Sequence, residues 1–386
     1  MNSQSSAEPV LPSRGSADGL RKRIGDLLAR ADVCIDGDRP WDMRIKGPGV
    51  LERLASRGSL GLGEAYMDGD WDAERLDEFF AHVLRAGLDR QVRPLALVIP
   101  ALWACLCNCQ SARRAWKVGR VHYDLGNEFF RAMLGPSMAY SCGYWTKAST
   151  LQEAQEAKLD LICRKLRLEP GMRLLDIGCG WGSLMAHAAR HYGVVCVGIT
   201  VSKEQAEYGA KQHAGLPLEF RLQDYRDIRG KYDRISSVGM FEHVGRKNHR
   251  TFMRVANGCL EDDGIFLLHT IGKRERRCHT DPWIEKYIFP NGEVPSMGQL
   301  GDAIDGFFVA EDFHNMGADY DRTLMAWHEN FEAAWPRFAG KMGERFHRQW
   351  RYYLLSCAGA FRARDMQVWQ CTLSKQGIPG GYPRIS

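Results

Sequence analysis

The stretch LLDIGCGWG, residues 174–182, decides the fold of this chain. Its first half is apolar and predicts a buried strand, and its second half predicts a glycine turn leading into a helix over residues 183–191. Glycines lack a Cβ, so the backbone can approach a ligand closely, and the helix N-terminus offers free N–H groups. The spacing is G-x-G-x-G, with Ser183 where a dinucleotide fingerprint has its third glycine. The turn therefore favours a ligand without a pyrophosphate, and an ordinary strand–turn–helix is the alternative.

The rest of the chain from about residue 119 alternates between strand and helix patterns. Helices are predicted over residues 151–166 and 203–213, among others. The predicted strands are residues 173–178, 194–200, 218–224, 233–240, 264–271, 307–315 and 368–374. Such alternation predicts an α/β fold with a mostly parallel, doubly wound sheet. Ligands bind at the carboxyl ends of such strands near the switch point, which we expect at the strand that carries the glycine turn.

Length and charge limit the class of protein. A chain of 386 residues indicates two domains, and its net charge of +5 is too mild to predict a nucleic-acid partner. That charge is compatible with an anionic phospholipid surface. The sequence predicts a polar, disordered tail over residues 1–19, a helical domain over 20–118 and a catalytic domain over 119–386.

The predicted helical domain combines apolar and basic segments. Its clearest helix has an apolar face formed by Leu76, Phe79, Phe80, Val83 and Leu84. The apolar run 95–107, too short to span a bilayer, predicts a buried helix or a segment that touches lipid from one side. Basic residues begin and end the domain, and they form either a solvated face or a phospholipid headgroup site: Arg21, Lys22, Arg23, Arg113, Arg114, Lys117 and Arg120.

The twelve cysteines show no regular framework. Cysteine behaves as a small buried hydrophobe in many cores, so we expect reduced thiols in a cytoplasmic protein. Cys105, Cys107 and Cys109 alternate along the chain and lack a partner pair at zinc spacing. The sequence therefore predicts no metal site.

Polar residues at strand ends indicate how a cofactor would bind. Asp176 can accept from a cationic amine or anchor the glycine turn. The second strand ends at Thr200 without the acidic residue that usually binds ribose, so the amide of Gln205 is our candidate, with Glu204 as the alternative. Asp224 and Tyr225 follow the third strand and suit an adenine amine and ring, although Asp224 could equally cap a helix.

Two ionisable residues follow the next two strands. Glu242 comes after the fourth strand, and His269 lies near the end of the fifth. We expect these strands to be neighbours, on the side of the first strand opposite the ribose strand. A single His or Glu is usually structural, but two ionisable groups at adjacent strand ends beside a predicted ligand indicate catalysis.

The glycine turn resembles motif I of the Rossmann-like S-adenosylmethionine methyltransferases. Longer segments resemble the cyclopropane-fatty-acyl-phospholipid synthases, from about residue 112 to 374. They are YSCGYW (140–145), MFEHVG (240–245), FLLHTIG (266–272), DPWIEKYIFPNGEVPS (281–296), GADYDRTLMAW (317–327) and CAGAFRARDMQVWQ (357–370). The presence of a helical region before them resembles the bacterial phospholipid enzymes more than the mycolic-acid synthases. The resemblance implies a seven-stranded class I methyltransferase fold preceded by a small helical lipid-binding domain.

The resemblance also implies the reaction. A methylene group from S-adenosylmethionine is added to the cis double bond of an unsaturated acyl chain in a membrane phospholipid, which forms a cyclopropane ring. Aromatic walls would shield the intermediate cation from water, and the candidates are Tyr140, Tyr144, Trp145, Phe241 and Tyr320. The alternatives are a methyltransferase that closes no ring, and a cofactor-binding lipid-transfer or regulatory protein without catalysis.

Site residues carried over by the resemblance fall into two groups. Those expected to bind the cofactor are Tyr140, Ser141, Asp176, Gly178, Gly180, Gly182, Thr200, Gln205, Asp224 and Tyr225. A bicarbonate base is expected to contact the backbone of Cys142 and Ile271 and the side chains of Glu242, His269 and Tyr320, with Cys357 as a rival, lower-ranked catalytic residue. The resemblance further implies a homodimer that is cytoplasmic and peripherally associated with the inner face of the membrane.

Overall fold

The computed structural model describes residues 17–90, 125–276 and 280–386. The apolar run 95–107, the basic residues between 113 and 120, the three alternating cysteines and most of the predicted tail lie outside these ranges. The first helix begins at Ala17, so it includes the last three residues of the tail predicted over 1–19. The predicted boundary at residue 118 also lies outside the described residues.

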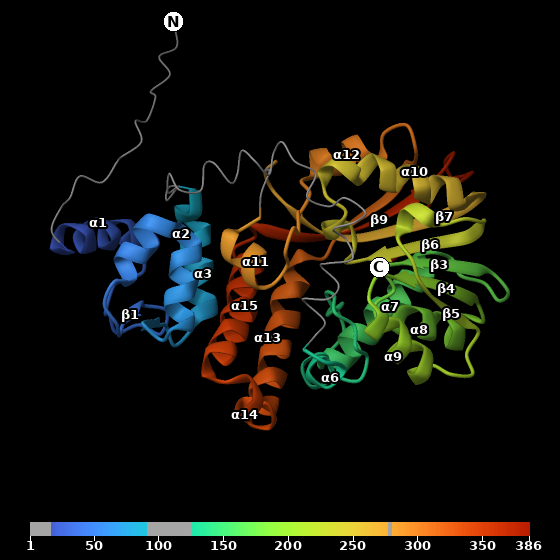
Figure 1. The fold of residues 1–386 in the computed structure, drawn as a ribbon. Coiled ribbons are helices and arrows are strands. Elements are labelled where there is room, and N and C mark those ends of the chain that lie inside the picture. Colours follow the sequence, from blue (N-terminus) through green and yellow to red (C-terminus); the bar gives the residue numbers. More distant parts are fainter. Residues whose placement is uncertain (1–16, 91–124, 277–279) are drawn as a thin grey trace, which may run out of the picture.

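A seven-stranded sheet forms the centre of the larger part of the molecule (Figure 1). Its strands lie in the order β5-β4-β3-β6-β7-β9-β8. They are β3 (Arg173–Ile177), β4 (Val195–Thr200), β5 (Leu218–Leu222), β6 (Tyr232–Val238), β7 (Leu260–Lys273), β8 (Val309–Asn315) and β9 (Met366–Ser374). Only β9 runs antiparallel to its neighbours β7 and β8. All seven predicted strands are present, and the predicted α/β fold with a mostly parallel sheet is confirmed.

Helices cover both faces of this sheet, as Figure 1 shows. They alternate with the strands along the chain: α6 (Asn127–Leu134), α7 (Leu151–Lys165), α8 (Ser183–Tyr192), α9 (Lys203–Gln212), α10 (His249–Cys259), α11 (Pro282–Tyr287), α12 (Met297–Ile304), α13 (Gly317–Ala334), α14 (Ala339–Met342) and α15 (Glu344–Arg362). Short 3-10 helices are η3 (Tyr225–Asp227), η4 (Phe241–His243), η5 (Arg246–Asn248) and η6 (Trp335–Arg337).

Strand periodicity sorts the sheet into two cores. Leu174 packs with α7 and α8, whereas its neighbour Leu175 packs with α10 and α12 on the opposite face. Side chains two residues apart along a strand share a face, so Asp176 points to the α7 face together with Leu174. His269 shares that face for the same reason, because Ile265 and Leu267 of β7 pack in the α7 core. The α7 face therefore carries Asp176, predicted to bind the cofactor, and His269, predicted to act in catalysis.

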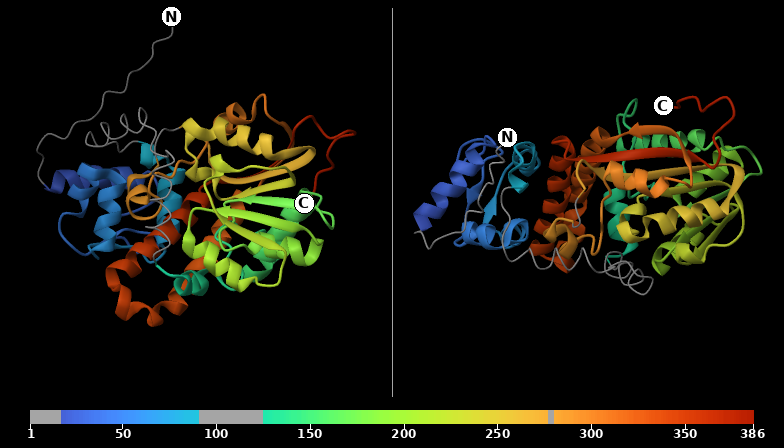
Figure 2. Two further views of the ribbon diagram at one scale, coloured as in Figure 1. Left: turned by 45° about the vertical axis from the view of Figure 1, so that its right-hand side comes forward. Right: turned by 90° about the horizontal axis from the view of Figure 1, so that it is seen from above.

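The N-terminal helical region packs against helices of the catalytic part rather than hanging from a linker. It contains α1 (Ala17–Ala29), β1 (Arg44–Ile45), α2 (Val50–Met67), β2 (Trp71–Asp72), α3 (Leu76–Arg85) and η1 (Leu88–Arg90). The rings of Tyr66 and Phe80 lie 5.3 and 5.2 Å from that of Tyr352 on α15. Arg362 binds the buried carboxylate of Asp77 at 2.5 Å. Figure 2 shows α13 and α15 between this region and the sheet.

Two further sequence expectations concern the surface and the thiols. The apolar face of α3 is buried, since Leu76, Phe79 and Phe80 are at most 9% exposed. Each cysteine in the described ranges has a free thiol. None of the helices in those ranges combines the length and the apolar character that spanning a bilayer requires.

Candidate active site

The glycine turn follows β3 and is shaped by its neighbours. Gly178 and Gly182 have φ angles of 87° and 86°, which residues with a Cβ rarely adopt. A Cβ on Gly178 would lie 2.7 Å from Met240, and one on Gly182 would lie 2.4 Å from Phe220. Gly180 has a φ of 54°, but a Cβ there would meet no atom within 4 Å. Packing therefore requires the outer glycines, whereas Gly180 leaves open space in which a ligand can approach the backbone.

Asp176 lies buried directly before this turn. Its Oδ1 accepts a hydrogen bond from the Ser236 hydroxyl at 2.8 Å, and it makes no ion pair with a described residue. Burial raises the pKa of Asp176 to about 6, although the Ser236 hydrogen bond and the charge of Lys158 oppose that rise. The second carboxylate oxygen remains available, which fits the predicted contact with a cationic amine.

The end of β4 forms a closed hydrogen-bond arrangement. The Thr200 hydroxyl donates to Oε1 of Gln205 at 2.9 Å and accepts from the backbone N–H of Ser202 at 3.1 Å. Both Thr200 and Gln205 are buried. Because Oε1 is occupied, the amide nitrogen of Gln205 is the group left for a ribose hydroxyl.

The end of β5 supports one of its two predicted adenine contacts better than the other. Asp224 caps η3 by accepting from the backbone of Arg226 at 2.9 Å, and the Arg226 guanidinium binds both carboxylate oxygens. The capping alternative is thus realised. Tyr225 lies in the core of the α10 face, with its ring 5.3 Å from that of Phe252. This burial leaves Asp224 as the better adenine candidate, because the Tyr225 ring is used for packing.

The loop before α7 holds three predicted site residues. The hydroxyl of Tyr140 lies 3.0 Å from that of Tyr353 on α15. The Ser141 hydroxyl accepts from Nζ of Lys158 at 2.9 Å. Cys142 is fully buried, and burial raises the pKa of its thiol well above its usual range. The thiol therefore stays protonated, and the backbone of Cys142 is the part that can bind an anion.

Glu242 is the most unusual acid in the site. Its Oε1 accepts from the backbone N–H of Ile271 at 2.6 Å, but Oε2 is buried and has no hydrogen-bond partner among the described residues. Burial raises the pKa of Glu242 to about 7. An unsatisfied buried carboxylate oxygen is costly, so its presence indicates a missing donor. The N–H of Ile271, predicted to contact bicarbonate, is occupied by Glu242 in this structure.

His269 is held neutral on the neighbouring strand. Burial lowers its pKa to about 3, and the charges of Lys158 and Lys165 lower it further. The side-chain amide nitrogen of Gln370, a donor, lies 3.3 Å from Nδ1. With Nδ1 as the acceptor, the single ring proton lies on Nε2, which can donate to an anion.

Tyr320 completes this group from α13. It is 8% exposed, and its pKa is raised well above its usual range by burial and by the neighbouring groups Cys142, Tyr140 and Glu242. Its hydroxyl makes no hydrogen bond to a described residue and stays protonated, so it can donate. The structure thus places Glu242 against the backbone of Ile271, and Tyr320 lies within electrostatic reach of Cys142 and Glu242. Tyr320 can donate and Oε2 of Glu242 can accept, a combination that suits a small oxyanion.

Comparisons with known proteins agree with this geometry. The family model for mycolic acid cyclopropane synthetase matches residues 110–371. A cyclopropane-fatty-acyl-phospholipid synthase from Escherichia coli is 53% identical over 94% of this chain and 95% of its own length. The chain belongs to the cyclopropane synthase family. It is an S-adenosylmethionine-dependent enzyme of the methyltransferase class, as the sequence resemblance predicted.

One solved structure and one further relative show how much of the chain each match covers. The mycolic acid cyclopropane synthase CmaA1, solved with SAH and CTAB, is 34% identical and covers 67% of this chain and 98% of its own, with a TM-score of 0.63. A probable fatty acid methyltransferase from Pseudomonas putida is 38% identical over 68% of this chain and 70% of its own. The greater coverage by the E. coli synthase confirms the stronger resemblance to the phospholipid enzymes, since it includes the N-terminal helices.

Aromatic rings surround the Tyr320 side of this synthase-type site. The Trp327 ring lies 5.3 Å from that of Tyr140 and 5.7 Å from that of Tyr320, and Phe361 lies 4.7 Å from Tyr320. Phe241, a predicted wall residue, instead stacks on His249 in the core of the α10 face. Of the five predicted wall residues, Tyr140 and Tyr320 are therefore the two that share one aromatic cluster.

The remaining wall candidates and the rival cysteine have other surroundings. Tyr144 packs edge-on against His314, and Trp145 donates to the Thr323 hydroxyl at 2.8 Å. Burial raises the pKa of Cys357 to about 12. A thiolate is strongly disfavoured there, which agrees with ranking Cys357 below Glu242.

Sequence reasoning missed Lys158, Gln155 and Gln370. Lys158 and Gln155 lie on the buried face of α7, and Gln370 lies in β9, all at most 2% exposed. Their signal was a polar residue at a position that the helix or strand period assigns to the core. Such residues are rare unless they are paired, so their burial was a signal in the sequence, although their partners were not.

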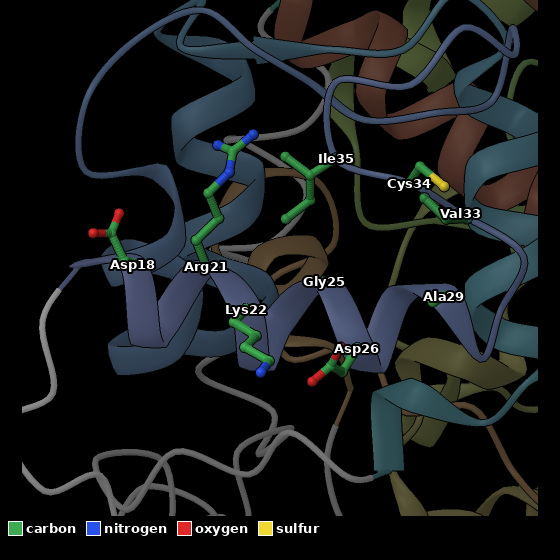
Figure 3. Close-up of a pocket in the computed structure, with 9 residues that line it drawn as sticks. All are labelled: Asp18, Arg21, Lys22, Gly25, Asp26, Ala29, Val33, Cys34 and Ile35. Carbon is green, nitrogen blue, oxygen red and sulfur yellow. The ribbon is translucent and has the colours of Figure 1, made fainter.

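The pocket in Figure 3 is unrelated to this site. It is an open depression of about 540 Å³ on α1, lined by residues such as Arg21, Lys22 and Cys34. Figures 1 and 2 place α1 at the end of the molecule opposite the sheet. Across the described part of the chain, no group of three or more His, Cys, Asp or Glu could hold a metal ion.

Proposed function

We propose that this enzyme adds a methylene group to the cis double bond of unsaturated acyl chains in membrane phospholipids, which forms a cyclopropane ring, with bicarbonate as the base. The observation that carries the proposal is Oε2 of Glu242, a buried acceptor that has no donor among the described residues, close to the protonated hydroxyl of Tyr320, which makes no hydrogen bond to them either. The phospholipid substrate is supported by the name of the E. coli relative, since the match between the two proteins spans 95% of that relative's length.

The residues of the glycine turn suit S-adenosylmethionine. Gly180 leaves its backbone accessible, Asp176 can offer a carboxylate oxygen to the amine, and the amide nitrogen of Gln205 is left to donate to a ribose hydroxyl. When bound, the cofactor supplies an electrophilic methyl group on a sulfonium. The remaining chemistry belongs to the protein, which must orient the alkene, exclude water and direct the final proton transfer.

Ring formation takes two steps, a methyl transfer to the alkene and the loss of one proton. The π electrons of the alkene would form the bond to the incoming methyl carbon as its bond to the sulfonium sulfur breaks and S-adenosylhomocysteine leaves with that electron pair, so that a cation would form on the other alkene carbon. Loss of one proton from that methyl group releases the electron pair that closes the ring. Tyr140 and Tyr320 belong to one aromatic cluster around Trp327, and their ring faces would stabilise a nearby cation while excluding water.

The anion site would hold bicarbonate through complementary groups. Tyr320 and Nε2 of His269 donate to its oxygens, and the N–H of Cys142 is a third donor. Oε2 of Glu242 accepts the hydroxyl proton, which turns an apparent repulsion into a hydrogen bond. Bicarbonate bound in this way keeps a basic oxygen free to take the proton lost from the methyl group.

We further propose that the helices α1 to α3 form the lipid-binding domain of a homodimeric, cytoplasmic enzyme that associates peripherally with the inner face of the membrane. Support comes from the exposed basic residues Arg21, Lys22 and Arg23 of α1 and from the mild positive net charge of +5. The shared packing of α3 and α15 would transmit the position of this domain to the aromatic cluster.

The decisive experiment incubates the enzyme with S-adenosylmethionine and vesicles of a monounsaturated phospholipid. The expected product gains one CH₂ group by mass spectrometry and shows upfield cyclopropane protons by nuclear magnetic resonance. Release of S-adenosylhomocysteine without any change in the lipid would contradict the substrate assignment.

A second candidate function is methylation without ring closure, which the P. putida relative's name favours. Methyl transfer followed by loss of a different proton yields a methyl-branched alkene. That product has the same mass as the cyclopropane, so the magnetic resonance spectrum separates the two. Vinyl or methylene protons in place of ring protons would establish this alternative.

A further inference from the structure

Lys158 is a buried lysine on α7 that makes no ion pair with any residue the structure describes. It is 2% exposed, and the Ser141 hydroxyl at 2.9 Å is its hydrogen-bond acceptor. Lys165 lies two turns later on the same buried face, is fully buried, and is paired with Asp312 at 3.2 Å. Buried charges are normally paired, so Lys158 differs from its matched neighbour in lacking an anion.

The chemistry of an ammonium group fixes the direction of the bond to Ser141. An ammonium has donors and no acceptor, so the Ser141 oxygen must accept from Lys158. A hydroxyl that accepts in this way still has one proton to donate. Ser141 is 7% exposed, and its hydroxyl makes no other hydrogen bond to a described residue. Its proton must therefore point away from Lys158.

The backbone around Ser141 is held from the same helix. The side-chain amide of Gln155 donates to the carbonyl of Ser141 at 2.9 Å and to that of Ala139 at 3.4 Å. Gln155 is fully buried and precedes Lys158 by one helical turn. The two residues thus fix both the backbone of Ser141 and the orientation of its hydroxyl.

Asp176 lies on the strand that α7 covers and interacts electrostatically with Lys158. The two side chains do not form an ion pair, and Asp176 accepts from Ser236 instead. The site therefore presents a carboxylate and, separately, an ammonium with an oriented hydroxyl. This pairing is complementary to an α-amino acid, whose ammonium suits Asp176 and whose carboxylate suits the other two groups.

We propose that Lys158 is a positioning residue that makes the Ser141 hydroxyl a donor to the α-carboxylate of the bound cofactor. The inference rests on the proposed function, because it takes the ligand of the glycine turn to be S-adenosylmethionine. Lys158 acts through Ser141 and contributes its positive charge to the same carboxylate. Together with Asp176 it recognises the amino-acid end of the cofactor, whereas the glycine turn and Gln205 recognise the nucleoside.

The test is calorimetric binding of two ligands to the full-length enzyme: S-adenosylhomocysteine and its decarboxylated analogue. Ser141→Ala and Lys158→Met are each expected to weaken S-adenosylhomocysteine binding roughly tenfold to hundredfold, the scale of a hydrogen bond to a charged group. The double variant is expected to bind about as weakly as either single variant, since both changes remove one interaction. Affinity for the decarboxylated analogue should change less than about threefold in all three.

Lys165→Met is the matched control, since it removes an equally buried lysine from the same helix. It can lower stability but should leave the ratio of the two affinities as in the wild type. If Lys158→Met does not fold, Lys158→Gln keeps a donor without the charge and is expected to lose a smaller part of the preference for S-adenosylhomocysteine.

Two outcomes overturn the inference in distinguishable ways. If the wild-type enzyme binds neither ligand, the proposed function fails and the inference fails with it. If the wild type binds S-adenosylhomocysteine but Lys158→Met weakens both ligands equally, the cofactor assignment stands and Lys158 has only a structural role.

Discussion

The carboxyl ends of β4 and β5 differ from those of β6 and β7 in how their polar groups are partnered. At the first pair of strands, Thr200 binds Gln205 and Asp224 binds Arg226, so each side chain already has a protein partner. Such self-contained groups hold one geometry before any ligand arrives. This half of the site is therefore built to recognise a cofactor of fixed shape.

The ends of β6 and β7 show the opposite arrangement. Among the described residues, neither Oε2 of Glu242 nor the Tyr320 hydroxyl has a hydrogen-bond partner, and burial keeps His269 neutral. Perturbed, incompletely satisfied groups cluster where chemistry occurs, because a folded protein keeps such costs only for function. The comparison teaches that one half of the site binds and the other half reacts, and each prediction below tests that division.

Glu242→Gln should have the largest effect and should fall on turnover. Glutamine keeps the size and an acceptor for the Ile271 N–H, but it cannot take the anion's hydroxyl proton as strongly. General-base steps contribute about 10²–10⁴ in rate, so we expect a loss of that order in kcat with little change in S-adenosylhomocysteine affinity. A kcat close to that of the wild type would contradict the assignment of Glu242 to the reactive half of the site.

The same variant has an independent signature in stability. Burial raises the pKa of Glu242 from 4.5 to about 7, so ionisation of this group favours unfolding as pH rises through that window. Glu242→Gln removes that cost and should be more stable than the wild type above pH 7, by at most on the order of 3 kcal/mol. Thermal unfolding at pH 8 and pH 4.5 checks the sign, since the difference should vanish at the lower pH.

Asp176→Ala should have the next largest effect and should fall on cofactor binding. The change removes a buried carboxylate. Its Oδ1 accepts from Ser236, and its second oxygen is left to accept from the cofactor amine. We expect S-adenosylhomocysteine to bind roughly tenfold to hundredfold more weakly in calorimetry. Asp176→Asn, which can still accept from Ser236, controls for folding, and unchanged affinity in both variants would remove Asp176 from the cofactor site.

The pH dependence of turnover should follow Glu242. Its carboxylate must be ionised to accept a proton, so activity should fall about tenfold per pH unit below its pKa of about 7. His269, with a pKa lowered to about 3, stays neutral throughout this range and adds no second limb. Rates at saturating bicarbonate check this, and the residual activity of Glu242→Gln should lack the limb.

The sequence predicted the strands and their ends because periodicity and glycines report directly on backbone geometry. All seven strands, the glycine turn, and the placement of Glu242 just after β6 and of His269 on the neighbouring strand β7 were predictable in this way. The resemblance added the residue roles, which stay predictions. Tyr225 and Phe241 show the limit, because an aromatic residue after a strand packs into whichever core the local turn presents, and both face the α10 side.

Buried polar partners were the part that sequence could not supply. Lys158 became informative only when the structure showed that Lys165 pairs with Asp312, whereas Lys158 forms no ion pair within the described ranges. Gln370 likewise gained meaning from its register opposite His269 in β7 and His314 in β8. Such pairings join residues more than 50 positions apart or select one of two equivalent lysines, and no local pattern encodes them.

Gln370→Leu tests the orientation of His269 and should have a moderate effect on the reactive half. The amide nitrogen of Gln370 lies 3.3 Å from Nδ1, and its loss frees the ring to place its proton on either nitrogen. We expect kcat to fall roughly threefold to tenfold and the bicarbonate concentration needed for half-maximal rate to rise. Cofactor affinity should be unchanged, and a loss confined to that affinity would contradict the assignment.

Thr200→Val should have the smallest effect, on the binding half. Valine matches threonine in shape but cannot donate to Gln205 or accept from the N–H of Ser202. The Gln205 amide then loses the bond that fixes its nitrogen toward the ribose position. Because the nitrogen itself remains, we expect only a twofold to fivefold weaker binding of S-adenosylhomocysteine, about the value of one neutral hydrogen bond, with kcat unchanged. Thr200→Ser keeps the hydroxyl and should bind like the wild type. A fall in kcat comparable to that of Glu242→Gln would show that the two halves of the site are not separable.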